Sequence, residues 1–190
     1  MTLESSKSEL RTRIGDIARQ ISTTQRAEAS AQVCAKLERL EIWARARLIL
    51  FFAPTLSEMN IWPLVAQAQA SAKWVALPRF SDASQSYVPC LLENIEENLQ
   101  PGRYGIREPS TGCREVELNQ LDLVLVPGVA FDLHGRRLGR GKGFYDRLLA
   151  GVRGTKCGIA FDEQIVAEVP AGPHDIHLNC ILTPTRLIET

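Results

Sequence analysis

The sequence has no excess of charge of either sign and no apolar run of membrane-spanning length. Lysine and arginine number 22, and aspartate and glutamate also number 22, so the formal net charge is zero. General binders of nucleic acid or of anionic membranes carry a basic excess, so we expect neither class of partner. The longest apolar run, residues 48–53, is far shorter than the ~20 residues that a membrane-spanning helix needs. A site for an anion must therefore come from the local placement of charge.

Clustered metal ligands are also lacking. The chain has three histidines and five scattered cysteines, with no Cys-x-x-Cys pair: Cys34, Cys90, Cys113, Cys157 and Cys180. Zinc sites and disulfide frameworks need such clusters, so neither is expected. The charged residues 1–7 are followed by no apolar stretch of the kind found in secretory signals. We therefore expect a cytoplasmic protein with reduced thiols.

What is present is the composition and patterning of one α/β domain over residues 1–190. Apolar residues at helical spacing predict a first helix over 8–21. A second helix is expected after an N-cap at Thr23 or Thr24, and its expected buried face consists of Ala27, Ala31, Cys34, Leu37 and Leu40. Further helices are expected at 58–72 and 144–149, and loops at 100–113 and 131–143. Apolar runs predict strands at 47–52, 74–77, 87–92, 123–126, 156–161 and 180–183. Buried strands that alternate with helices indicate a sheet with helices on both faces.

One segment predicts an anion site. The apolar run 123–126 stops at Pro127-Gly128, and a loop with Gly135, Gly139, Gly141 and Gly143 leads into the helix that starts near Phe144. A strand, a glycine loop and a helix in this order direct backbone N–H groups toward an anion. Four basic residues of the loop supply countercharge: Arg136, Arg137, Arg140 and Lys142. A solvated basic loop whose glycines only form turns is the alternative.

The spacing excludes two common phosphate motifs. A Walker loop needs glycine where Arg136 stands and Ser or Thr where Gly143 stands, and a dinucleotide fingerprint needs glycine at Phe144 or Asp146. The spacing thus predicts phosphate binding without identifying the ligand.

Residues 121–132, together with Gly135 and the run 137–147, resemble the signature of the 5-formyltetrahydrofolate cyclo-ligase family, also called methenyltetrahydrofolate synthetases. Other segments fit in the same order: Lys7 and Arg11, Glu58, 75–78, 104–109, 158–161, Gln164 and His174-Asp175. The resemblance implies a three-layer α/β/α sandwich with a mostly parallel central sheet.

The resemblance also implies an activity: closure of 5-formyltetrahydrofolate to 5,10-methenyltetrahydrofolate, using ATP and Mg²⁺ as cofactors. The formyl oxygen is phosphorylated, N10 attacks the activated carbon, and ADP and phosphate are released. Such chemistry depends on positioning and charge neutralisation, and it requires no nucleophilic side chain.

Site roles are implied position by position. Lys7 and Arg11 are expected on the nucleotide phosphates, and Arg140, Lys142 and Tyr145 are the expected catalytic residues. The whole run of Gly139, Arg140, Gly141, Lys142, Gly143, Phe144, Tyr145 and Asp146 is expected to bind ATP. Glu58, Tyr104 and Tyr145 are expected to bind the folate. Asp146 and Asp175 are expected to hold Mg²⁺.

Three departures from the family pattern concern the folate side. Asn60 stands where threonine is common, Asn179 stands where a second aspartate often follows, and residues 81–87 lack a methionine that is frequent there. They keep open an ATP-using relative that acts on another substrate. A folate-binding protein without turnover is a separate alternative. The expected partners are thus a reduced folate and ATP. No dimer seam is evident, so a monomer is expected while a homo-oligomer remains open.

Overall fold

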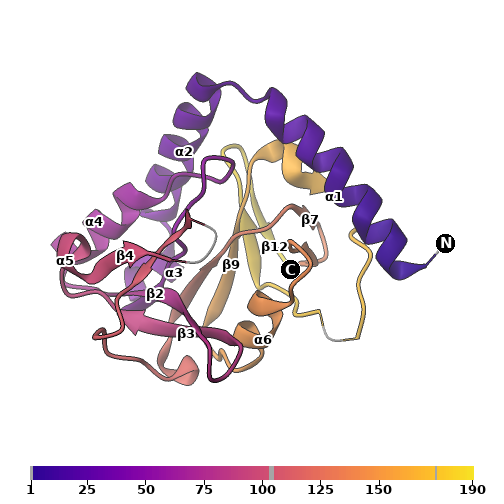
Figure 1. Cartoon of the computed structure of the whole chain (residues 1–190). Helices are drawn as coiled ribbons and strands as arrows, with labels where there is room; N and C mark the ends of the chain where they lie inside the picture. Colours follow the sequence, from indigo (N-terminus) through magenta and orange to yellow (C-terminus); the bar gives the residue numbers. More distant parts are fainter. Residues whose placement is uncertain (1, 103–104, 174) are drawn as a thin grey trace.

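A seven-stranded sheet forms the centre of the protein, as seen in a computed structural model that describes residues 2–102, 105–173 and 175–190 (Figure 1). Its strand order is β12-β11-β9-β6-β1-β2-β3. The inner strands β11, β9, β6, β1 and β2 are parallel to one another, while the edge strands β12 and β3 are antiparallel to them. The bounds are β1 Leu48–Leu50, β2 Trp74–Ser81, β3 Ser86–Leu91, β6 Leu123–Val126, β9 Thr155–Ile159, β11 Cys180–Leu182 and β12 Leu187–Glu189.

Helices cover both faces of this sheet. The helices α2 (Thr23–Leu37), α3 (Glu41–Arg45) and α4 (Trp62–Ala70) lie on one face, and α6 (Phe144–Ala150) lies on the other. Successive residues of β1 pack against the helices on opposite faces of the sheet. Ile49 packs in the cluster of α2 and α4, and Leu50 packs in the cluster that contains Leu148 of α6. Burial of each such aliphatic side chain contributes about 1.5–3 kcal/mol. The predicted three-layer α/β/α architecture with a mostly parallel sheet is confirmed.

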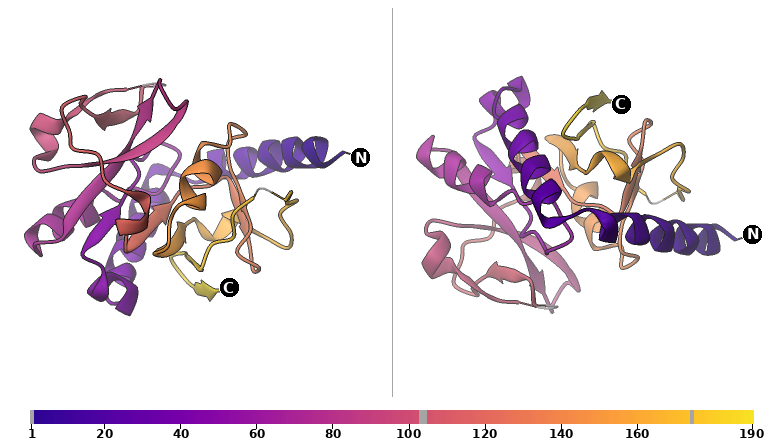
Figure 2. Two further views of the ribbon diagram at one scale, coloured as in Figure 1. Left: turned by 90° about the horizontal axis from the view of Figure 1, so that it is seen from below. Right: turned by 90° about the horizontal axis from the view of Figure 1, so that it is seen from above.

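The helix α1 (Leu3–Gln20) extends along one side of the molecule, with its first turns beyond the sheet (Figure 2). Leu10 and Ile14 are buried against Ala130, Leu138 and Val169. These contacts place α1 beside a small sheet of order β10-β7-β8, formed by Ile165–Val166, Ala130–Asp132 and Arg137–Leu138. The predicted loop at 131–143 was therefore partly wrong, because β7 and β8 form an antiparallel hairpin within it.

Some predicted boundaries were also wrong. The N-cap of α2 is Ser22, which forms a reciprocal capping box with Gln25. Cys34 and Leu37 are buried as predicted, but Ala27 and Ala31 are exposed. The helix α4 begins at Trp62, because residues 56–58 form a turn instead of a first helical turn. β2 continues through Pro78, since β1 pairs with it only as far as Ala76 and, in the described part of the chain, no strand on that side pairs with Pro78.

A second hairpin occupies the predicted loop at 100–113. It consists of β4 (Leu99–Pro101) and β5 (Arg107–Pro109), which follow the short helix α5 (Ile95–Asn98).

Among the described residues, no helix is both long enough and apolar enough to cross a membrane.

Candidate functional site

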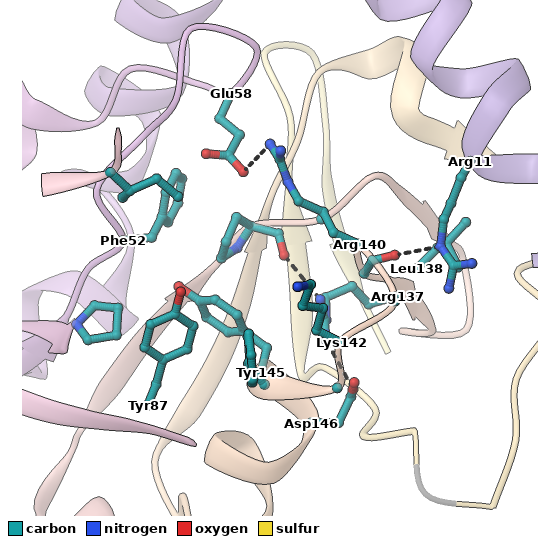
Figure 3. Close-up of a pocket in the computed structure, with 18 of the residues that line it drawn as sticks. Arg11, Phe52, Glu58, Tyr87, Arg137, Leu138, Arg140, Lys142, Tyr145 and Asp146 are labelled. Atoms are coloured by element: carbon teal, nitrogen blue, oxygen red, sulfur yellow. Dashed lines mark hydrogen bonds and ion pairs between the residues drawn. The ribbon is translucent and has the colours of Figure 1, made fainter. Parts of the chain in front are cut away.

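A cavity of about 440 Å³ lies between the glycine loop, α1 and the β4–β5 hairpin (Figure 3). The structure brings nearly all the predicted site residues to this one cavity: Lys7, Arg11, Glu58, the run 139–146 and Asp175. Tyr104 was also predicted, but it lies outside the described residues. Residues from both ends of the chain thus meet at one site, although their roles remain predictions.

The glycine loop reaches the cavity in a conformation that glycine favours. Gly141 has φ +95° and Gly143 has φ +62°, and Gly143 is the N-cap of α6. These left-handed conformations cost other residues about 1–2 kcal/mol, so glycine at both positions fits the backbone path. The path brings Arg140 and Lys142 to the cavity wall.

Arg137 is the buried cation of the site. Its side chain is only 4% exposed, and Nη2 donates to Oδ1 of Asp146 at 2.9 Å. Its guanidinium also lies over the ring of Tyr145, at 5.6 Å from the centroid. Arg137 therefore fixes both Asp146 and Tyr145. From the sequence, Arg137 was predicted only as one of the basic residues that balance the charge of an anion. Nothing in the spacing shows that its side chain is buried.

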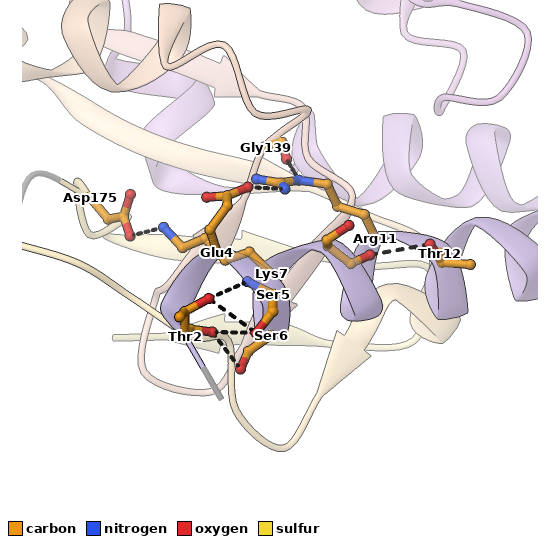
Figure 4. Close-up of polar contacts among 10 residues, drawn as sticks. Thr2, Glu4, Ser5, Ser6, Lys7, Arg11, Thr12, Gly139 and Asp175 are labelled. Carbon is orange, nitrogen blue, oxygen red and sulfur yellow. Dashed lines mark hydrogen bonds and ion pairs between the residues drawn. The ribbon is translucent and has the colours of Figure 1, made fainter.

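The start of α1 is joined to a C-terminal loop by Lys7, whose Nζ donates to Oδ2 of Asp175 at 2.6 Å (Figure 4). The same oxygen accepts the N–H of Gly172 at 2.7 Å. Burial alone would raise the pKa of Asp175, but the hydrogen bond from Lys7 and that from Gly172 outweigh it and hold the pKa below its ordinary value. Asp175 is therefore ionised at neutral pH.

Arg11 lies one turn after Lys7 on the same face of α1, as the spacing predicts (Figure 4). Its Nε donates to the carbonyl of Gly139 at 3.0 Å, and its Nη1 pairs with Oε1 of Glu4 at 2.8 Å. Arg11 therefore connects α1 to the glycine loop.

Glu58 and Arg140 meet at the top of the cavity in Figure 3, where Nη2 of Arg140 donates to Oε1 of Glu58 at 3.0 Å. Oε2 of Glu58 accepts the N–H of Thr55 at 2.9 Å, which fixes the turn before α4. The hydrogen bonds with this turn and with Arg140 therefore hold the carboxylate of Glu58 in place.

Aromatic rings form the apolar wall. Tyr87 contacts both Phe144 and Tyr145, and its ring centroid lies 5.3 and 6.1 Å from theirs. Phe52, two residues after β1, also lines the cavity (Figure 3). Burial, followed by the proximity of Glu58 and Tyr87, raises the pKa of Tyr145 far above its ordinary value. The phenol is therefore a neutral donor. Sequence reasoning missed Phe52 and Tyr87 as site residues, because β1 and β3 come to lie on either side of β2 only in the folded sheet.

The donor set of the cavity fits Mg²⁺. Asp146 and Asp175 both line it, and Mg²⁺ binds proteins through one or two carboxylates plus phosphates and waters. Among the described residues there is no group of three or more His, Cys, Asp or Glu side chains of the kind that holds a metal by protein ligands alone. A cation at this cavity would therefore share its ligands with a phosphate.

The fold and the cavity define an α/β protein with a cationic glycine loop at a ligand site. A family model described as the 5-formyltetrahydrofolate cyclo-ligase family matches residues 3–184, and the chain belongs to this family of ligases.

Three relatives cover most of the chain. The 5-formyltetrahydrofolate cyclo-ligase of Escherichia coli strain K12 is 31% identical, over 90% of this chain and 96% of its own. The enzyme of that name from Mycolicibacterium smegmatis is 32% identical, over 95% of both chains. The solved structure of Aquifex aeolicus 5,10-methenyltetrahydrofolate synthetase is 31% identical with a TM-score of 0.87, over 96% of this chain and 92% of its own. The expected family is thus confirmed.

Proposed function

We propose that this protein converts 5-formyltetrahydrofolate and ATP into 5,10-methenyltetrahydrofolate, ADP and phosphate. The observation that carries the proposal is one cavity with two kinds of wall. Its glycine loop and α1 supply cations, and Phe52, Tyr87 and Tyr145 supply aromatic surface. A phosphate donor and a substrate with flat pyrimidine and benzoyl rings require such walls side by side.

The reaction follows from the chemistry of the formyl group. Its oxygen is a poor leaving group, so it first attacks the γ-phosphorus of ATP, which forms an O–P bond and releases ADP. N10 then attacks the formyl carbon, the C–O bond breaks with loss of phosphate, and the N10 proton passes to solvent. The protein's part is to align the reactants and to neutralise charge.

The chain's own residues have matching roles in this proposal. Arg140, Lys142 and the N–H groups of the loop would neutralise the charge on the transferred phosphoryl group, and Lys7 and Arg11 would bind the remaining phosphates. Glu58 would accept hydrogen bonds from the pterin, and Tyr145 would pack against it. Asp146 and Asp175 would hold Mg²⁺, which neutralises phosphate charge when bound.

An absorbance assay tests the proposal. Purified protein is mixed with 5-formyltetrahydrofolate, Mg²⁺ and ATP, and the near-ultraviolet absorbance of the methenyl product is followed with and without ATP. An ATP-dependent rise is expected.

Two alternatives give different results in the same experiment. A protein that binds the folate without turnover gives a flat trace together with saturable folate binding. An ATP-using relative with another substrate gives a flat trace and no folate binding. The departures at Asn60, Asn179 and residues 81–87 motivate the test for another substrate.

A further inference from the structure

The β4–β5 hairpin forms the end of the cavity opposite α1. Ile106, Arg107 and Glu108 line the cavity there, and Oε2 of Glu108 accepts the N–H of Phe80 at 3.1 Å, which ties the hairpin to β2. Figures 1 and 2 place this hairpin and α1 on opposite sides of the molecule. A substrate that reacts at the glycine loop therefore has room to extend its other end toward the hairpin.

Four arginines among the described residues line the cavity. Three of them have carboxylate partners within the site: Arg11 with Glu4, Arg137 with Asp146 and Arg140 with Glu58. The fourth, Arg107, forms no ion pair with another residue in the described part of the chain. A ligand carboxylate can bind Arg107 without displacing a protein carboxylate.

The side chain of Arg107 is exposed yet held in place. Its guanidinium lies over the ring of Trp62, with 5.6 Å between Cζ and the ring centroid. A cation–π contact of this kind restrains a guanidinium, and the N–H groups of a guanidinium match a carboxylate with two parallel hydrogen bonds. The contact with Trp62 thus restrains Arg107 at the cavity, where its N–H groups suit a carboxylate.

We propose that Arg107 binds a carboxylate on the glutamyl tail of the folate substrate. This inference rests on the proposed function and deepens it. The tail bears the two carboxylates of a folate, both remote from the formyl group. Arg107 would therefore select substrates with an anionic tail and would take no part in phosphoryl transfer.

Arg107→Gln tests this role, because glutamine removes the charge and leaves Trp62 in place. The dissociation constant of 5-formyltetrahydrofolate is measured without ATP, and KM and kcat are measured with ATP. An analogue whose glutamyl residue is replaced by methylamine keeps the benzoyl amide and loses both carboxylates. Arg107→Lys tests whether charge alone suffices, and Arg153→Gln, an exposed arginine outside the cavity lining, is the matched control.

For Arg107→Gln we expect the dissociation constant and the folate KM to rise about tenfold, as for the loss of one charge-assisted pair. We expect the carboxylate-free analogue to bind Arg107→Gln and the wild type equally, and Arg107→Lys to retain part of the affinity. Equal losses for substrate and analogue, or no loss for either, would overturn the assignment. If the wild type forms no methenyl product from the folate and ATP, the proposed function itself fails, and that result is distinct from either outcome.

Discussion

Arg140 and Glu58 hold each other in an ion pair across the cavity, with 3.0 Å between Nη2 and Oε1. One is the proposed ligand of the phosphoryl group, and the other is the proposed ligand of the pterin. The guanidinium is largely exposed and its partner is largely buried, so Arg140 is the member with freedom to move. Binding of a phosphate near Arg140 therefore competes directly with Glu58.

Glu58→Gln tests this competition. The neutral amide pairs weakly with both the pterin and Arg140, so we expect the folate KM to rise about tenfold. The ATP KM should not rise, because Arg140 loses its competing carboxylate. Steady-state kinetics with each substrate varied in turn gives both constants. An unchanged folate KM would contradict the role of Glu58.

Arg140→Ala and Lys142→Ala should each reduce kcat by about 100-fold or more, since each charge acts mainly on the transferring phosphoryl group. The absorbance assay measures the loss. Arg136→Ala is the matched control, because Arg136 belongs to the same segment but pairs with Glu168 at 3.0 Å and is not among the residues that line the cavity. Wild-type rates for both loop variants would refute the loop assignment.

Asp146→Asn should raise the Mg²⁺ concentration required for half-maximal rate, because an amide is a weaker ligand for a hard cation than a carboxylate. The measurement is a Mg²⁺ titration of initial rates at saturating ATP. Glu168→Gln removes an exposed carboxylate outside the cavity lining and serves as the control. A titration curve that coincides with that of the wild type would exclude Asp146 as a metal ligand.

Asp175 should make the stability of the fold depend on pH. Its pKa is lowered in the folded protein, so folding favours the ionised form and this contribution is complete above the unfolded value, about 3.9 for an aspartate. The contribution is lost as the pH falls below that value toward the lower folded pKa. Urea unfolding of the wild type and Asp175→Asn at a series of pH values measures it. We expect the difference in free energy of unfolding between the wild type and Asp175→Asn to become smaller below about pH 4. A difference that stays constant down to the acid limit would be inconsistent with the Lys7–Asp175 pair.

The thiols should differ in reactivity. Burial raises the pKa of Cys34 and of Cys90 to about 11, so at neutral pH almost none of either thiol is ionised. Cys113 is only half-buried, beside the carbonyl of Asn98. We expect iodoacetamide to label Cys113 first in the native protein, as read by peptide mass spectrometry. Equal labelling of Cys34 and Cys113 would contradict this order.

The sequence predicted best where one local rule applied. The apolar run at 123–126 is β6 with the same bounds, because a strand buried on both faces needs no alternation. The glycine loop was placed correctly before α6, since Gly143 supplies the left-handed turn that starts the helix. Lys7 and Arg11 share a face because their spacing is that of one helical turn.

The sequence predicted poorly those features of the site that depend on tertiary contacts. Glu58 was placed at the start of a helix, yet its side chain caps Thr55 in a turn that Arg140, more than 80 residues later, also contacts. Arg137 turns inward because Asp146 and the ring of Tyr145 receive it. Such pairings depend on the folded path of the chain, which no local spacing encodes.

The ion pair between Lys7 and Asp175 spans 168 positions of the chain. Because a ribosome releases the polypeptide from its N-terminal end, α1 emerges early and must wait for nearly all of the remaining residues before this contact can form. The cavity wall at Lys7 is therefore complete only after Asp175 has left the exit tunnel. A nascent chain truncated before Asp175 would lack the contact with Lys7, even if its whole glycine loop were outside the ribosome. Added nucleotide should therefore not protect such a chain from proteolysis.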